Sequence, residues 1–385
     1  MTRTVSTLLL ALSLSSLALA QDSSNIRNPT INTESDEGKP LVAAGLAESA
    51  AERIPILEGY LQQFPQGEYR GYALFQAQKA YMEAGQDDKV VEVGKELMKL
   101  VPNDLEVRHN VNQALVKLQR WDELAPLLDQ TRPIAEKQVA EPQPSGADEE
   151  AAAHWKSQKE YAEGVVQWLE WATNTAALQQ TDPKAKVAWM DRLTTTYPDG
   201  QFSKGLETQY VVAYQQMGDQ DNMVAWMKKA VDAGSQDETY YYTLAEDALN
   251  KQDEAAAKTY ADKTLELLES KPVPEGMSEA QWTEHKNKIG AYTEFLYGRI
   301  YMPKNTKDAY RAARSHMLKS VDVLKAEGGP RYHVLAYYLG VCYVQLDIQG
   351  DNIKQAAYWM GQAASTDGQF KGQAAEALKK INAAR

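Results

Sequence analysis

The chain has 385 residues, of which 43% are hydrophobic and 24% are charged, and its formal net charge at pH 7 is −12. This hydrophobic content is sufficient for a packed core and excludes general disorder, and the length fits two or three ordinary domains or one long array of repeats. An acidic chain without a basic block is poorly suited to nucleic acid or to an anionic membrane surface, so neither is expected as a partner.

Residues 1–20 have the pattern of a secretory signal peptide. Arg3 supplies the positive charge, an apolar stretch follows from Leu8 to Leu19, and small residues precede the expected cleavage between Ala20 and Gln21. The apolar stretch is shorter than the roughly 20 residues that span a bilayer, so no transmembrane span is expected in the mature chain. The protein is therefore predicted to be exported, and periplasmic or secreted after cleavage.

Residues 21–40 lack apolar periodicity and are expected to form a mobile mature N-terminus. Beyond them, the turn FPQGEY at 64–69 recurs as YPDGQF at 197–202, an offset of 133 residues (197 − 64). At the same offset Tyr81 falls on Tyr214 and Gly85 on Gly218. Such self-similarity is the signature of stacked supersecondary units.

The content of the repeated unit is helical. After each turn, apolar residues recur at three- and four-residue spacing, which predicts a helix that Gly85 or Gly218 ends in the left-handed conformation. A polar pair and a second amphipathic run follow in both copies. Each unit is therefore predicted to be a helical hairpin.

These hairpins resemble the tetratricopeptide repeat (TPR), a unit of 34 residues. In a unit that begins at Gly71, the residues Tyr81, Gly85 and Pro102 fall on positions 11, 15 and 32 of that repeat. Further units begin at Leu105, Lys204 and Glu238, while Leu339, Gly340 and Tyr343 fit positions 7, 8 and 11, and Gly298 and Tyr301 form another such pair. The resemblance implies an all-α fold, an α-α superhelix or solenoid of about seven TPR-like hairpins.

Two stretches interrupt the array. Residues 133–150 are proline-rich and acidic and are expected to form a linker or loop, and residues 270–278 form a second break before a capping box of Ser278 and Gln281. The breaks either divide the array into separate blocks or are loops on one continuous superhelix, which we prefer. The predicted TPR-like blocks are 41–132, 151–271 and 272–385, the second opening with a long helix from Ala151 to about Gln179 and the third closing with a capping helix.

Motifs for chemistry are missing from the sequence. The 5 histidines are scattered singly without the i, i+4 spacing of a zinc site, and there is neither a glycine-rich phosphate loop nor a nucleophile elbow. The single cysteine, Cys342, lies in an apolar helical run and is expected to be buried. The chain is therefore predicted not to be an enzyme, with no catalytic residues, no cofactor and no metal.

The TPR resemblance places a binding groove on the concave face, at positions 2, 5, 9, 12 and 13 of the first helix of each hairpin. It implies a protein or peptide partner that is bound without chemistry. The lysine and asparagine that clamp a carboxylate in chaperone-binding members are missing at positions 5 and 9. The implied groove residues are Tyr72, Phe75, Lys79, Met82, His109, Gln113, Lys117, Thr208, Val212, Gln215, Tyr242, Glu246, Asn250, Tyr337 and Gln345.

The aromatic-proline turns are similar to those of exported TPR proteins of the Gram-negative cell envelope, although no cysteine for a lipid anchor stands at the cleavage point. The first hypothesis is therefore an exported scaffold that binds a protein or peptide in the envelope. The alternative is a helical module that binds glycan or cell-wall material through the Trp- and Tyr-rich segment 155–171. Binding to peptidoglycan that is lost in Trp168→Ala would favour the alternative.

Overall fold

Side-chain caps determine where many of the helices begin. The Asp104 carboxylate accepts a hydrogen bond from the backbone N–H of Val107, and the Thr306 hydroxyl caps a later helix in the same way. Ser278 and Gln281 form the predicted capping box. Each cap satisfies an N–H group that the first helical turn leaves without an intrahelical acceptor.

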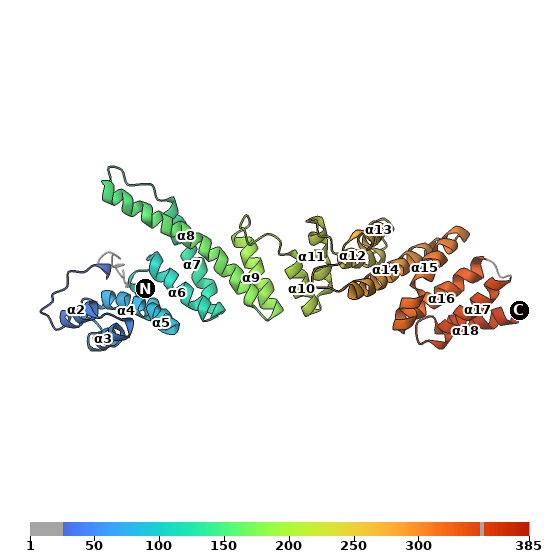
Figure 1. Cartoon of the computed structure of the whole chain (residues 1–385), viewed down its shortest axis with the longest axis horizontal. Coiled ribbons are helices and arrows are strands. Elements are labelled where there is room, and N and C mark those ends of the chain that lie inside the picture. Colours follow the sequence, from blue (N-terminus) through green and yellow to red (C-terminus); the bar gives the residue numbers. More distant parts are fainter. Residues whose placement is uncertain (1–25, 347–349, 385) are drawn as a thin grey trace, which may run out of the picture. The chain divides into compact units, whose positions relative to one another are not determined.

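The computed structural model describes residues 26–346 and 350–384 (Figure 1). The predicted signal peptide, 1–20, and its cleavage position at Ala20 and Gln21 lie outside the described residues. The chain divides into an N-terminal unit, which ends at Lys204, and a C-terminal unit, which begins at Gly205.

The described part of the N-terminal unit is entirely helical apart from turns and loops. Its helices are α2 (Gly38–Leu46), α3 (Ala50–Gln63), α4 (Arg70–Glu83), α5 (Asp87–Leu100), α6 (Leu105–Lys117), α7 (Trp121–Ala140), α8 (Glu149–Gln179) and α9 (Pro183–Thr196).

The C-terminal unit has the same character. Its helices are α10 (Glu207–Met217), α11 (Gln220–Asp232), α12 (Glu238–Asn250), α13 (Glu254–Ser270), α14 (Glu279–Tyr301), α15 (Lys307–Glu327), α16 (Gly329–Leu346), α17 (Asp351–Ser365) and α18 (Lys371–Ala383), with a short 3-10 helix, η1 (Met302–Lys304), after α14.

Within each unit every helix packs against the next helix in sequence, as a stack of hairpins requires. The pairs α4–α5, α6–α7, α8–α9, α10–α11, α12–α13, α14–α15 and α16–α17 are the predicted TPR-like hairpins, and α18 closes the array. The first helices of neighbouring hairpins also meet, α6 with α8 and α12 with α14. The all-α repeat architecture is thus confirmed for the described residues.

Close packing inside the hairpins depends on small residues. A Cβ atom on Gly298 would lie 2.4 Å from Cγ of Met317, and one on Gly340 would lie 2.9 Å from Cγ of Met360. Both glycines stand at repeat position 8, so each lets the second helix approach closely. At the predicted helix end, Gly85 has a φ of +67°, in the left-handed region that favours glycine.

The prediction of a mobile segment at 21–40 is corrected for its described part. Ile26 is buried beside Gly71, Arg27 forms ion pairs with Asp104 and Glu106, and α2 already begins at Gly38. The segment lacks a periodic pattern because scattered contacts, rather than a helical stripe, attach it: besides Ile26 and Arg27, Asn32 N–H donates to the Tyr69 hydroxyl and Glu37 accepts from the Tyr60 hydroxyl.

The prediction of a loop over 133–150 is also corrected, because α7 continues through Pro133 to Ala140. Proline removes one helical hydrogen bond, but Ala135 just beyond it is fully buried, and this packing keeps the helix intact. The loop is therefore limited to 141–148. The long helix that follows, predicted from Ala151 to about Gln179, is α8.

The boundary between the two units follows α9, inside the block that was predicted as 151–271. The helices α8 and α9 pack within the N-terminal unit, whereas α10 and α11 pack with each other in the C-terminal unit. Among the described helices, none combines the length and the hydropathy that a membrane crossing requires.

Candidate partner-binding surfaces

The implied groove residues lie on the first helices α4, α6, α10, α12 and α16, as the repeat register requires. Two of them, Phe75 and Tyr242, are buried. Those that are exposed in the structure are Lys79, Lys117, Thr208, Val212, Gln215, Asn250 and Gln345. Those that are half-buried are Tyr72, Met82, His109, Gln113, Glu246 and Tyr337.

Repeat position 5 carries an aromatic ring on most of the first helices. The rings are Phe75, His109, Tyr242 and Tyr337, and the register of Gly298 adds Phe295 on α14. On α4 and α12, position 9, one helical turn later, supplies a charged partner: Lys79 lies 4.6 Å from the Phe75 ring, and Glu246 accepts a hydrogen bond from the Tyr242 hydroxyl at 3.0 Å. We call these rings the position-5 aromatics.

On α4, the position-5 aromatic Phe75 is covered by the chain itself. The Arg27 guanidinium lies 4.5 Å from the centre of the ring, and both Asp104 oxygens accept hydrogen bonds from Arg27 Nη2 at 2.9 Å. Glu106 accepts a further hydrogen bond from Arg27 Nη1. The predicted groove position is therefore already occupied.

On α6, His109 lies in a small cluster of aromatic and amide groups. Gln113 Nε2 donates to His109 Nε2 over 3.1 Å, so the ring proton is on Nδ1, which donates to the Tyr161 hydroxyl of α8 over 2.9 Å. The Trp168 ring meets the imidazole edge-on at 4.7 Å. Burial lowers the pKa of His109 to about 4, against a smaller opposite effect of the Glu106 charge, so the imidazole is neutral at pH 7.

The Trp- and Tyr-rich segment lies on α8 and is divided between two roles. Trp155 donates a hydrogen bond to the Glu141 carbonyl at 3.1 Å and so holds the end of the 141–148 loop. Tyr161 and Trp171 remain 39% and 41% exposed, and the Trp168 and Trp171 rings are 5.9 Å apart. Two separate sequence predictions, the groove at His109 and the aromatic segment, therefore meet in one place.

In the C-terminal unit an arginine links the first helices of two hairpins. Arg299 Nη1 on α14 donates to both Glu246 oxygens on α12, at 2.9 and 2.7 Å, and Nη2 lies 3.4 Å from Asn250 Oδ1. Tyr242 donates to the same Glu246 carboxylate, and burial together with this charge raises the pKa of the Tyr242 hydroxyl. These contacts join three implied groove residues, but they bind one another.

Beside this network a pocket of about 290 Å³ opens between α14 and α16. Phe295, Val334 and Tyr338 form its apolar wall, Arg299 and Arg331 line its rim, and Pro330 and Gln369 complete it. The Arg331 guanidinium lies 4.4 Å from the centre of the Tyr292 ring, and within the described residues it has no ion pair. The site therefore offers an exposed cation next to apolar surface.

Sequence reasoning missed the residues of α14, although a signal was present. Gly298 and Tyr301 have the spacing of positions 8 and 11, and the same register places Tyr292, Phe295 and Arg299 on positions 2, 5 and 9. Tyr337, an implied groove residue, is half-buried on α16, and the Phe370 ring from the turn before α18 stacks on it at 4.3 Å.

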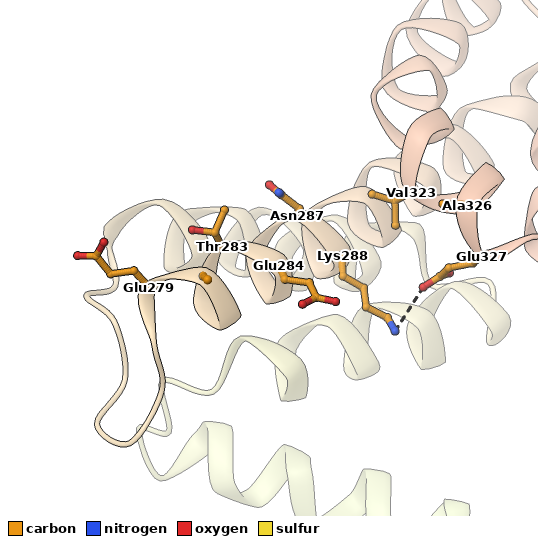
Figure 2. A pocket seen from close by; sticks show the side chains of 9 residues that line it. Glu279, Thr283, Glu284, Asn287, Lys288, Val323, Ala326 and Glu327 are labelled. Carbon is orange, nitrogen blue, oxygen red and sulfur yellow. Dashed lines mark ion pairs between the residues drawn. The ribbon is translucent and has the colours of Figure 1, made fainter.

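A larger depression, of about 930 Å³, lies between α14 and α15 and contains none of the implied groove residues (Figure 2). Figure 2 shows Glu279, Thr283, Glu284 and Asn287 along α14, and the ion pair of Lys288 with Glu327 of α15, 3.3 Å long. The lining is open to solvent and combines charged and polar side chains with the apolar side chains of Ala280, Val323 and Ala326.

The described residues contain neither a cluster of metal ligands nor an activated thiol. Over residues 26–346 and 350–384, no three His, Cys, Asp or Glu side chains come together as a metal site. Cys342 is buried, as predicted, and burial raises the pKa of its thiol to about 12, so it is not an activated nucleophile.

Comparisons with known proteins do not place the chain in a family. No protein-family model matches the chain, and no curated protein matches it either. Among solved structures, the chain is similar to the TPR domain of P58(IPK), with 13% identity, a TM-score of 0.26, and coverage of 91% of this chain and 98% of that one. It is also similar to yeast Tom70, with 11% identity, a TM-score of 0.24, and coverage of 87% and 85%. At such scores the TPR-like architecture rests on the helix pairs themselves.

Proposed function

We propose that this protein is a non-catalytic scaffold of TPR-like hairpins that binds a protein partner through the inner face of its C-terminal unit. The observation that carries the proposal is the pocket over Phe295 and Tyr338, with Arg331 at its rim. An apolar pocket with a few fixed polar groups is the usual form of a recognition site. An exposed cation on a chain of net charge −12 favours a partner segment that carries a carboxylate.

The partner segment would place an apolar side chain against Phe295 and a carboxylate beside Arg331. Because the helices already form the pocket, little ordering of the scaffold would oppose binding. Arg299 is held by Glu246, so it contributes mainly the shape of the rim and Arg331 contributes the charge.

The test uses photo-crosslinking in intact cells, with a photoreactive residue in place of Gln369, which lines the pocket. A single defined protein should be captured, and Arg331→Glu should reduce its capture about tenfold or more because like charges would then face each other. The matched control is Arg311→Glu, which reverses an exposed arginine on α15 whose ion pair within the described residues is with Asp308. Capture that is the same in Arg331→Glu and wild type would refute the site.

We further propose that the protein binds this partner in the cell envelope or outside the cell. The support is the signal-peptide pattern of residues 1–20. Mass spectrometry of the protein from its native host should find a mature N-terminus at Gln21. An intact Met1 in the native protein would contradict export.

A second candidate, the glycan-binding module, is favoured by the exposed rings of Tyr161 and Trp171 on α8. Flat aromatic rings beside amide groups such as Gln113 can stack on sugars and hydrogen-bond their hydroxyls. Calorimetric titration with soluble peptidoglycan fragments should then show binding that Trp171→Ala abolishes. Trp171 is the better probe than Trp168, because Trp168 also packs on His109.

A further inference from the structure

The inner face of the N-terminal unit holds two residues of the chain's own N-terminal segment. Ile26 is 3% exposed and lies against α4 where Gly71 leaves room, since a Cβ atom on Gly71 would lie 3.0 Å from Ile26 Cγ1. Arg27 follows and reaches the position-5 aromatic Phe75. The two side chains thus occupy adjacent sites, one apolar and one acidic.

The acidic site recognises the guanidinium in three ways. Asp104 accepts from Arg27 Nη2 through both oxygens, Glu106 accepts from Nη1, and the flat face of the guanidinium covers the Phe75 ring. Two carboxylates hold the planar fork of arginine, and stacking on a ring adds attraction. A lysine ammonium would make fewer of these contacts, so the site is built for arginine.

The Asp104 carboxylate is held in place without Arg27. Asp104 is the N-cap of α6, bonded to the backbone N–H of Val107 at 3.0 Å, and its side chain is only 6% exposed. A second cation, Lys79, lies at the site, with its Nζ 3.9 Å from Glu106 Oε1. With Arg27 withdrawn, the two carboxylates and the aromatic ring would remain available to another guanidinium.

Space for a longer ligand adjoins the site. A pocket of about 580 Å³ extends from Arg27, Asp104 and Glu106 to the side chains of His154, Gln158 and Tyr161 on α8. A bound segment could therefore continue past its arginine along α8 without displacing a helix.

We propose that Phe75, Asp104 and Glu106 form an arginine-binding subsite, which Arg27 fills within the chain and which a protein partner fills with its own arginine. The occupant is a partner segment in which a branched aliphatic residue precedes the arginine, as Ile26 precedes Arg27. The N-terminal segment competes with it at a local concentration on the order of millimolar, so a partner binds only when it displaces the segment. This inference concerns the N-terminal unit and does not depend on the pocket over Phe295.

The test titrates a fluorescent synthetic peptide, with the sequence of residues 22–31, into the full chain. The variant Ile26→Ala/Arg27→Ala empties the subsite and should bind the peptide about tenfold or more tightly than the wild type does. A peptide with alanine in place of its arginine should lose this gain. The matched control is Arg70→Ala, which removes an arginine of similar exposure that pairs with Glu96 on the same unit.

A second measurement keeps Ile26 and Arg27 in place. Asp104→Asn/Glu106→Gln removes both charges, while asparagine still caps α6. Trypsin should then cleave after Arg27 at least about fivefold faster than in the wild type, because the guanidinium is no longer held. Equal peptide binding by the wild type and the emptied variant, or unchanged cleavage after Arg27, would overturn the proposal.

Discussion

The two units differ in what covers their position-5 aromatics. Phe75 and Phe295 occupy the same repeat position and are both 3% exposed, each beneath a guanidinium. Arg299, over Phe295, belongs to the same helix and forms an ion pair with Glu246 of the preceding hairpin. Arg27, over Phe75, belongs to a segment that precedes the hairpins.

Arg299 is therefore an integral part of the repeat array, whereas Arg27 is attached to the array from outside it. Because Arg299 extends from α14 itself and Arg27 belongs to a segment outside the hairpins, we expect Arg27 to leave Phe75 more readily than Arg299 leaves Phe295. A buried ring in the groove is therefore not evidence against binding. What matters is whether the residue that covers it is part of a hairpin.

The largest expected effect tests this comparison at the two rings. Phe75→Ala and Phe295→Ala should each lower the free energy of unfolding of their own unit by about 3–5 kcal/mol, because each ring is fully buried. Hydrogen exchange read by mass spectrometry resolves the two units separately. In Phe75→Ala, trypsin should also reach Arg27; if Arg27 stays protected, the ring does not contribute to holding the segment.

The next effect is a dependence on pH that only the N-terminal unit should show through His109. The folded pKa of His109, about 4, is below its ordinary value of 6.5, so the unfolded chain binds more protons between these values. Stability is complete above pH 6.5 and falls as the pH drops toward 4. Between pH 7 and pH 5 the free energy of unfolding should decrease by about 1–2 kcal/mol from this group.

Urea unfolding of the wild type and of His109→Phe at both pH values checks this expectation. The phenyl ring cannot titrate, so the variant should lack that decrease, whereas His154→Gln, a change at an exposed histidine of α8, should keep it. An NMR titration that placed the pKa of His109 near 6.5 would contradict the burial of the imidazole.

Much of the fold could be predicted because the hairpins repeat with a fixed period. Gly85, Ser278 and the limits of α8 followed from local rules of capping and periodicity. Pairs of packed residues in which a large side chain on one helix is matched by a small one on the other were harder to predict. Gln78 replaces a small residue at position 8, and its amide is accommodated because Gly94 faces it, at 2.7 Å from where a Cβ atom would lie.

The repeat alignment also failed in the α10–α11 hairpin, where a different tyrosine from the aligned one is buried. Tyr81 is buried, but Tyr214, which the 133-residue offset aligns with it, is only half-buried. In that hairpin the Trp226 ring stacks on the Tyr210 ring, with the ring centres 3.7 Å apart, and Tyr210 is the buried tyrosine. Nothing in the 34-residue pattern indicates which of two tyrosines one turn apart faces the tryptophan.

The candidate site could be predicted only in part, for a related reason. The register placed Phe75, His109 and Tyr242 on the inner face, but it could not show that Arg27 and Tyr161 lie over two of them. Those covering residues come from a non-repetitive segment and from α8, which is longer than a repeat helix. Contacts of this kind depend on tertiary packing, so no repeated pattern in the sequence predicts them.

The smallest expected effect compares one hydroxyl in each unit. Tyr161→Phe removes the acceptor of the His109 Nδ1 proton, and Tyr242→Phe removes a donor to Glu246, which still keeps Arg299. We expect a loss of about 1 kcal/mol for Tyr161→Phe and about 0.5 kcal/mol or less for Tyr242→Phe, because only the first leaves a polar group without a protein partner. Urea unfolding with unit-resolved hydrogen exchange measures both. A larger loss for Tyr242→Phe would mean that the hydrogen bond to Glu246 contributes more to the stability of its unit than the hydrogen bond to His109 does.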